Sequence, residues 1–280
     1  MPSQMNNYEA EKQTIIPGKL LNVDDKLRRW GMSVFTIAMF IIFWQVAAVK
    51  QWLSLPTPGV VTATLIRLIV SGDPVYGKTL QQMTFASLMI VLKGCFLSMV
   101  TAIPLGMMLG TFRFFEQFAG ILLEMFRPIP PLAWIPLAYI LFQDFSSPTT
   151  YVQIFVVFVG AFFPVLLNTT QGIKSVEKRF INAAITCGAT RWQIISKVLF
   201  PASISHMVTG LRIGLGVGWM CVIAAEFVGG KMGIGYYIWS VYSIGGRSAE
   251  IIAGTITIGL IGYLMNKLFL VMEKRLQPWR

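Results

Sequence analysis

The sequence predicts an all-α membrane protein with about six transmembrane helices. Of its 280 residues, 55% are hydrophobic and only 12% are charged, and the mean hydropathy is +0.66. The apolar residues fall in long blocks, and a block of roughly 20 residues forms a helix that crosses the ~30 Å core of a bilayer. The six blocks lie at residues 30–49, 85–112, 118–142, 151–167, 204–228 and 251–272.

The first block, Trp30–Val49, contains no charged residue and follows a polar stretch. Its apolar run exceeds the roughly 7–15 residues of a signal peptide and no small-residue cleavage site follows it, so we expect a retained span. Residues 1–29 are then a cytoplasmic N-terminal arm, and residues 30–280 form the transmembrane domain. After the first span, Ser54–Gly72 has apolar positions every three to four residues, which predicts an amphipathic helix at the membrane interface.

The distribution of Lys and Arg predicts the orientation of the chain. With the N-terminus inside, fourteen of these residues lie on the cytoplasmic side and five lie outside, namely Lys50, Arg67, Lys78, Lys231 and Arg247. Because positive residues concentrate on the cytoplasmic side, we expect a multi-pass protein of the cytoplasmic (inner) membrane with both termini in the cytoplasm. The net charge of +11 then reflects membrane orientation, and no binding to nucleic acid is expected.

The sequence lacks the residues that a metal site, a catalytic site or an ATP site would need. It has a single histidine, His206, and three widely separated cysteines without metal-ligand spacing. An intramembrane enzyme would need a nucleophile–base pair or a metal cluster. No phosphate-binding loop of the GxxxxGK type, ending in Ser or Thr, occurs. We therefore expect a non-catalytic chain that binds no metal and no cofactor.

The longest cytoplasmic loop, residues 171–203, contains the stretch NAAITCGATRWQIISKVLFP. The stretch has helical propensity, with Glu177 ahead of it and Pro201 as a predicted stop. A helix outside the membrane that carries this many apolar side chains needs something to cover them. A partner protein is one interpretation, and a helix lying on the lipid headgroups is the alternative.

This loop resembles the EAA signature of ABC importer permeases, which reads Glu-Ala-Ala, three residues, Gly, nine residues, Ile, one residue, Leu-Pro. The matching positions are Asn182, Ala183, Ala184, Gly188, Val198, Phe200 and Pro201. The spacing is matched throughout, while the side chains differ at Asn182, Val198 and Phe200. Because Asn182 lacks the carboxylate of the motif, an ion pair made by the family's Glu is not expected here.

The resemblance implies that the loop forms a coupling helix that docks on an ATP-hydrolysing subunit. Small Ala183, Ala184 and Gly188 would permit close approach, Trp192 would fill a cleft as an anchor, and Arg191 would pair with acidic groups at the rim. The resemblance further implies two ATPase subunits that carry ATP and Mg²⁺, a second permease copy in a homodimer, and an extracytoplasmic substrate-binding protein. Transport would proceed by alternating access.

Two further stretches, RPIPPLAWIPL at 127–137 and LRIGLGVGWMCVIAAE at 211–226, are similar to permeases of taurine, alkanesulfonate, nitrate and bicarbonate importers. The resemblance favours a small anion, with taurine or an alkanesulfonate ahead of nitrate or bicarbonate. An ATP-independent secondary transporter is the alternative, but it should show inverted repeats with paired broken helices, and none is evident in the sequence.

Charged residues and prolines inside the apolar blocks are the candidates for a translocation path. Intramembrane charges are costly and need a partner or a purpose, and broken helices often line substrate routes. The candidates are Lys93, Arg127, Pro128, Pro130, Pro131, Trp134, Arg212, Trp219 and Glu226. Structural alternatives remain open: the prolines could form a kink that only shapes packing, and Arg212 could belong to an ion pair, for example with Glu226.

Gly210, Gly214 and Gly218 recur every four residues and share one helical face. This small-xxx-small pattern lets helix backbones touch in lipid. The contact could join two permease copies or two helices of one chain, and the sequence does not separate these alternatives.

Overall fold

The computed structural model describes residues 23–52 and 54–276, and its regular elements there are helices apart from one isolated antiparallel bridge between Asp73 and Lys78. The predicted all-α class is confirmed. The chain divides into two compact units, Met1–Val60 and Val61–Arg280. The predicted domain boundary between residues 29 and 30 stays a prediction.

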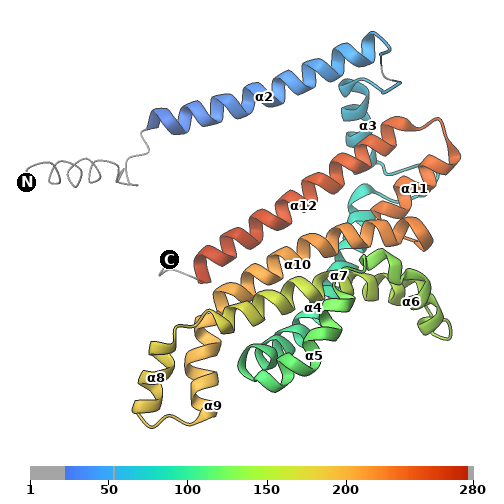
Figure 1. Cartoon of the computed structure of the whole chain (residues 1–280). Helices are drawn as coiled ribbons and strands as arrows, with labels where there is room; N and C mark the ends of the chain where they lie inside the picture. The colour runs from blue at the N-terminus through green and yellow to red at the C-terminus, as the bar shows by residue number, and fades with distance from the viewer. Residues whose placement is uncertain (1–22, 53, 277–280) are drawn as a thin grey trace, which may run out of the picture. The chain divides into compact units, whose positions relative to one another are not determined.

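The first unit contains helix α2, Val23–Val49 (Figure 1). Its segment Trp30–Val49 is long and apolar enough to span a membrane, and only 6% of the residues in its most apolar stretch are buried. After the helix, the Trp44 Nε1 donates a hydrogen bond to the Pro56 carbonyl over 3.1 Å. Because α2 begins at Val23, the last part of the predicted arm is helical, while residues 1–22 lie outside the described residues.

The remaining helices follow in the order α3 (Pro58–Val70), α4 (Leu80–Thr111), α5 (Arg113–Phe126), η2 (Pro131–Trp134), α6 (Ile135–Phe142), α7 (Pro148–Lys174), α8 (Lys178–Thr186), α9 (Arg191–Ile194), η3 (Ile195–Leu199), α10 (Phe200–Gly229), α11 (Ile234–Ile244) and α12 (Ser248–Leu276). Five helical segments in the described part are long and apolar enough to span a membrane. A sixth span results if the pair α5 and α6, bent by 92°, is counted as one. The predicted number of about six agrees.

One feature agrees with the sequence prediction and one differs from it. The third predicted span is broken at its proline-rich segment, as expected: α5 begins at Arg113 and ends at Phe126, and the segment that follows turns the chain by 92° before α6. Prolines remove backbone donors and disfavour a straight helix, which explains the break. Helix α11 was not predicted, and it lies between the last two spans, flanked by Gly233 (φ +130°) and Gly245 (φ +80°).

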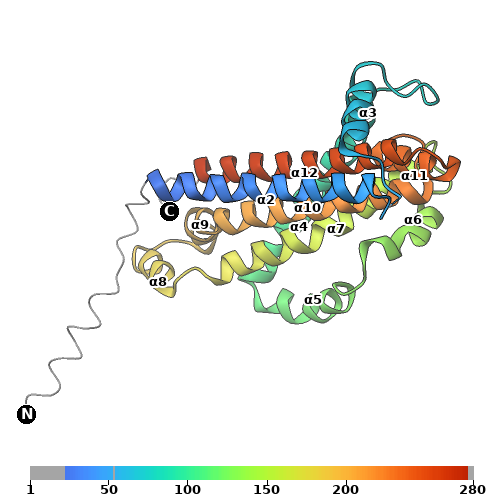
Figure 2. The ribbon, with the colours of Figure 1, turned by 90° about the horizontal axis from the view of Figure 1, so that it is seen from above.

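The core of the second unit is α7, which packs against α4 and α10 (Figures 1 and 2). Glycines allow the backbones to approach closely. A Cβ atom added at Gly94 would lie 2.9 Å from the Ile154 carbonyl oxygen, and one at Gly106 would lie 2.9 Å from the Leu166 carbonyl oxygen. Such contacts let helices pack where no hydrophobic effect drives them together.

The three glycines at spacing four on α10 also face α7. An added Cβ at Gly210 would lie 3.1 Å from the Pro164 oxygen, one at Gly214 3.1 Å from the Ala161 oxygen, and one at Gly218 3.1 Å from Val157 Cγ1. All of these neighbours lie on α7, which therefore occupies the glycine face of α10. The structure therefore corresponds to the alternative in which the glycines pack helices within one chain.

The fully buried side chain of Glu226 on α10 joins three helices. Its Oε1 accepts a hydrogen bond from Ser87 Oγ on α4 (2.6 Å), and its Oε2 accepts one from the Gly235 N–H (2.7 Å). Ser87 Oγ in turn accepts from the Ile234 N–H over 3.0 Å. The first N–H groups of a helix have no intrahelical partner and carry partial positive charge. Glu226 thus caps α11.

A second polar cluster joins the loop before α4 to α11 and α12. Buried Asp73 accepts a hydrogen bond from Tyr237 Oη (2.9 Å) and forms an ion pair with Arg247. Glu250 pairs with Arg67 at 2.7 Å and with Arg247 at 3.4 Å. Burial alone would raise the pKa of Asp73, but the hydrogen bonds from Arg247, Tyr237 and two backbone N–H groups outweigh it and lower this pKa below its usual value.

We predict that Gly233→Ala lowers the free energy of unfolding by about 1–3 kcal/mol, since φ +130° and ψ 166° are adopted essentially by glycine alone. An added Cβ would also collide with the Glu226 carboxylate. The measurement is the unfolding midpoint of the purified chain in mixed micelles. Gly259→Ala on α12 is the matched control, because an added Cβ there meets nothing within 4 Å. Equal midpoints for the two variants would contradict the capping geometry.

Candidate functional site

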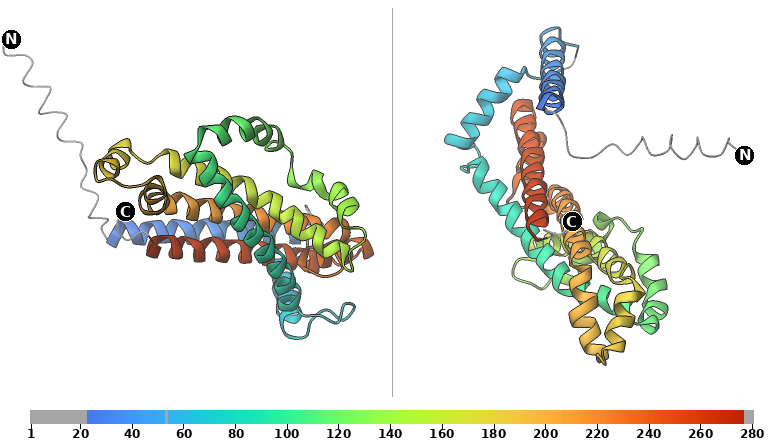
Figure 3. Two further views of the ribbon diagram at one scale, coloured as in Figure 1. Left: turned by 90° about the horizontal axis from the view of Figure 1, so that it is seen from below. Right: turned by 90° about the vertical axis from the view of Figure 1, so that its left-hand side faces the viewer.

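The loop that carries the EAA-like sequence forms a helical hairpin at the ends of α7 and α10 (Figure 3). Its first arm, α8, ends at a glycine-dependent turn. Gly188 has φ +76°, its N–H donates to the Ile185 carbonyl (2.9 Å), and the Ala189 N–H donates to the Ala184 carbonyl (3.0 Å). These two bonds form a Schellman motif, which usually needs glycine in the left-handed region.

The structure gives Gly188 a conformational role in the turn, and the expected close approach to a partner stays a prediction. We predicted a small residue that permits close approach to a partner. In the structure Gly188 is exposed, and an added Cβ would meet nothing within 4 Å in this chain. What the turn requires is the left-handed backbone conformation, which disfavours residues with a Cβ atom.

The second arm begins at a capping box. Thr190 Oγ1 accepts from the Gln193 N–H (3.4 Å), and the Gln193 side chain accepts from the Thr190 N–H (2.7 Å). Helix α9 then continues through the π-helical turn η3 into α10, so that Arg191–Gly229 is one continuous helical segment.

Pro201 was predicted to stop this helix, and the prediction is wrong. Pro201 lies in the first turn of α10, directly after the π turn Ile195–Leu199. The π turn shifts the hydrogen-bond register just ahead of a residue that has no N–H to donate. A displacement of α9 can therefore pass into α10 without an intervening flexible loop.

The hairpin presents an apolar and basic surface that the described chain leaves open. The side chains of Phe180 (52%), Ile185 (56%) and Trp192 (75%) are among the exposed large apolar groups. Asn182 and Ala183 are also exposed, Ala184 and Val198 are half-buried, and exposed basic residues lie around them, namely Lys178, Arg179, Arg191 and Lys197. Such a surface fits a protein partner with an acidic rim.

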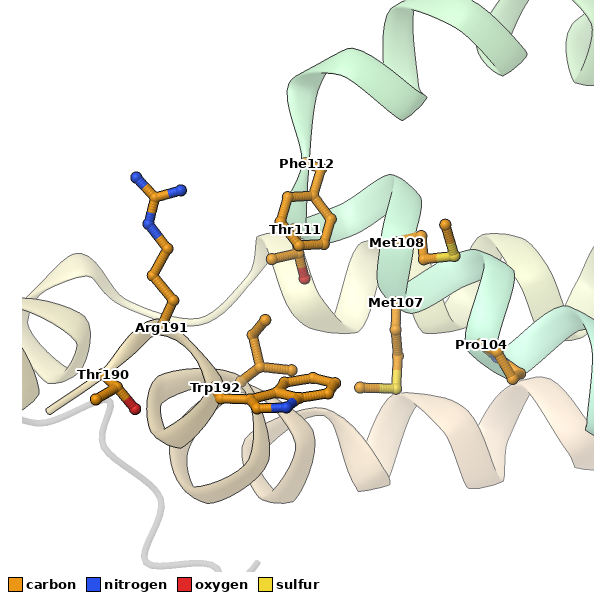
Figure 4. Close-up of a pocket in the computed structure, with 9 residues that line it drawn as sticks. Pro104, Met107, Met108, Thr111, Phe112, Thr190, Arg191 and Trp192 are labelled. Atoms are coloured by element: carbon orange, nitrogen blue, oxygen red, sulfur yellow. The ribbon is translucent and has the colours of Figure 1, made fainter.

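A groove of about 690 Å³ separates α9 from the end of α4. It is lined by Pro104, Met107, Met108, Thr111, Phe112, Thr190, Arg191, Trp192 and Ile195. Figure 4 shows the Trp192 indole directed toward Met107, whereas the Arg191 guanidinium points away from it. The indole of Trp192 thus lies in the groove while most of its surface stays exposed.

The predicted path residues lie in separate places. Lys93 is exposed on α4. Arg127, Pro128 and Pro130 lie in the break between α5 and η2, and Pro131 begins η2. Trp134 lies between the rings of Phe126 and Phe155, at centroid distances of 5.7 and 6.4 Å. Trp219 is buried, and its Nε1 donates to the Ile258 carbonyl on α12 (3.1 Å).

The remaining two path candidates have protein partners. Arg212 pairs with Glu273 on α12 at 3.6 Å, and Thr209 Oγ1 donates to the same carboxylate (2.9 Å). The example of Glu226 as the partner of Arg212 is therefore wrong, because Glu226 caps α11 and has no exposed surface. The structure does not bring the predicted path residues together at one site.

Sequence reasoning missed the polar edge of α5. Glu116 pairs with Lys174, the last residue of α7, over 2.6 Å. Glu116, Gly120 and Glu124 recur every four residues and border a pocket between α5 and α7 together with Arg127. This i, i+4 spacing was the signal that could have identified the edge.

Residues 102–280 match the family of binding-protein-dependent transport system inner membrane components. An ABC transporter permease protein of Methanocaldococcus jannaschii is 38% identical and aligns over 94% of this chain and 97% of its own length. The chain belongs to this permease family. It is a non-catalytic membrane subunit of an ABC importer, in the group whose relatives are named for nitrate, bicarbonate and taurine.

Other relatives show how broad this group is. The nitrate import permease NrtB of Synechocystis is 32% identical over 86% of this chain and 87% of its own length. The taurine transport system permease TauC of Escherichia coli is 31% identical over 90% of each chain. A solved chain of the inward-facing MetNI methionine ABC transporter superposes with a TM-score of 0.61 at 18% identity, covering 69% of this chain and 93% of that one, and shows the shared fold.

We predict that Gly188→Ala speeds amide hydrogen exchange at the end of α8 by about 5- to 30-fold, since a left-handed non-glycine residue costs about 1–2 kcal/mol. The measurement is exchange mass spectrometry on peptides that cover residues 178–190 of the purified chain. Gly188→Asn is the control and should stay near the wild type, because Asn tolerates this conformation. Unchanged exchange in Gly188→Ala would show that the turn does not depend on glycine.

Proposed function

We propose that this permease imports a small anion by coupling ATP hydrolysis in partner subunits to movement of its own helices. The observation that carries the proposal is the hairpin of α8 and α9. It exposes three large apolar side chains and several basic groups, it ends α8 with a Schellman turn, and it continues without a break into α10. An exposed apolar surface of this kind is typical of a protein interface.

We assign the hairpin as the docking site for an ATPase subunit. Trp192 is the anchor, because large aromatic side chains dominate interface energetics, and Arg191 pairs with an acidic rim. Ala183 and Ala184 admit close approach, Asn182 makes no ion pair, Gly188 shapes the turn, and Val198 and Pro201 join the hairpin to α10. Two ATPase subunits that bind ATP and Mg²⁺ serve a homodimer of this chain, whose termini lie in the cytoplasm.

Coupling follows from the connections of α10. Helix α9 passes through η3 into α10. Along α10, Thr209, Arg212 and Trp219 hold α12, and Glu226 holds α11. A force on the hairpin therefore reaches three helices through direct bonds. This is the physical link that alternating access requires between the ATPase and the path.

For the substrate we propose taurine or an alkanesulfonate, delivered by an extracytoplasmic binding protein. The similarity to the taurine permease of E. coli supports this choice. Nitrate and bicarbonate are the alternatives, supported by relatives of similar identity. For the path we propose the segment from Arg127 to Trp134, which holds Pro128, Pro130 and Pro131 and contains the break between α5 and η2. Lys93, Arg212 and Trp219 lie along the path on the neighbouring helices.

The proposal is tested by uptake of labelled taurine, ethanesulfonate, nitrate and bicarbonate in cells with and without this chain, before and after ATP depletion. We expect taurine or ethanesulfonate uptake that needs both the chain and ATP. Uptake of nitrate or bicarbonate alone would establish the alternative substrate. Chain-dependent uptake that survives ATP depletion would contradict the coupling.

We predict that Trp192→Ala lowers ATP-dependent uptake and recovery of the ATPase with the purified permease by about 30-fold, as expected for loss of an anchor worth about 2 kcal/mol. Both quantities are measured at equal amounts of membrane-inserted permease. Trp239→Ala is the control, since Trp239 is also exposed (46%) but lies on α11. Full ATPase recovery with Trp192→Ala would exclude this side chain as an anchor.

A further inference from the structure

A pocket between α5 and α7 is lined by two carboxylates, one guanidinium and one ammonium group. It has a volume of about 170 Å³, and the charged residues that line it are Glu116, Glu124, Arg127 and Lys174. Glu116 and Lys174 neutralise each other through an ion pair of 2.6 Å. Glu124 and Arg127 form no ion pair within the described part of the chain, although they lie only three residues apart.

The pocket is held in place by the packing of α5. Phe115, Ala119 and Leu123 pack on the apolar cluster that includes Leu109 and Leu166. This contact turns the neighbouring edge of α5, with Glu116, Gly120 and Glu124, toward α7. An added Cβ at Gly120 would meet nothing within 4 Å, so the middle of this edge is open.

Two charged side chains without an ion-pair partner are unusual in a segment that is apolar enough to span a membrane. The pair of helices α5 and α6 is apolar enough to count as a broken span. Charged side chains in such segments are expensive and indicate a functional site by default. The unpaired Glu124 and Arg127 are therefore available to a ligand that carries both signs of charge.

We propose that this pocket binds the transported substrate and that the substrate is a small zwitterion with an ammonium group and a strong-acid anion, such as an aminosulfonate. This inference rests on the proposed function and narrows its substrate class. The anionic group binds the Arg127 guanidinium, whose fork of N–H donors can bind two oxygens of one oxyanion. The ammonium group binds the Glu124 carboxylate, and the methylene groups between them contact the apolar wall formed by Leu123, Phe163 and Leu167.

The size and charge of the pocket exclude other ligand classes. One water molecule needs about 10–15 Å³ of cavity volume, so the pocket has room for a small organic ion. The pocket is smaller than the roughly 300–1,000 Å³ of sites for drug-sized ligands. A simple anion such as nitrate could use Arg127 but would gain nothing from Glu124. The carboxylate is thus the residue that distinguishes a zwitterion from an anion.

The test compares ATP-dependent uptake of taurine with that of ethanesulfonate, which lacks the ammonium group, in cells that carry the complete importer. Glu124→Gln should lower the ratio of taurine to ethanesulfonate uptake by about 10-fold or more, as expected for a lost charge-assisted hydrogen bond. The ratio is unaffected by the amount of permease in the membrane. Arg127→Gln should lower the uptake of both compounds. Asp144→Asn, an exposed acid outside the pocket, is the matched control and should change neither.

The outcomes separate this inference from the proposed function. If the wild-type chain imports taurine with ATP but Glu124→Gln leaves the ratio unchanged, the pocket assignment is wrong while the importer function stands. If the wild-type chain imports nitrate or bicarbonate and no sulfonate, both the substrate class and the pocket assignment fall. If Glu124→Gln does not reach the membrane, a competition experiment on the purified wild-type chain decides the same point. It measures binding of labelled taurine with excess unlabelled taurine or excess ethanesulfonate. Equal competition by the two compounds would overturn the assignment.

Discussion

The close contact of α7 with α4 and α10 is the constraint on which the second unit of this permease depends. In lipid, helices gain little from the hydrophobic effect, and close backbone approach with van der Waals contact takes its place. Glycines supply that approach on both sides of α7, at Gly94 and Gly106 on α4 and at Gly210 and Gly214 on α10. The three helices form the frame on which α5, η2, α6, α11 and α12 pack.

The functional elements extend from this frame. Helix α7 ends at Lys174, four residues before α8, and α10 starts where the π turn ends. The α8–α9 hairpin therefore has its two arms fixed to two helices that contact each other. On the opposite end of α10, Glu226 provides the cap of α11, so that a movement of α10 also moves α11. The polar edge of α5 is connected to the same frame through the Glu116–Lys174 ion pair.

The sequence predicted the features that depend on composition and local pattern. Long apolar blocks identified the spans, and the spacing around Gly188 identified the motif in the loop, where a single helix was expected and the structure has the two helices α8 and α9. Features that depend on contacts through space were not predictable. Arg212 and Glu273 are far apart in sequence, so a local pattern could not pair them. Helix α11 is 11 residues long, too short for a search for spans, and its cap comes from another helix. The left-handed φ of Gly188 explains its place in the motif only once the turn is seen.

The central claim is that the α8–α9 hairpin contacts an ATPase subunit. Its most direct test is a photo-cross-linking amino acid at Ile185, which is 56% exposed on α8, with Tyr242 on α11 (64% exposed) as the comparison position. The account predicts that position 185, and not position 242, cross-links in native membranes to a polypeptide that carries a Walker-type phosphate loop. A cross-link from position 185 to lipid alone would contradict the account, because the hairpin would then lie on the membrane surface and cover its apolar side chains there.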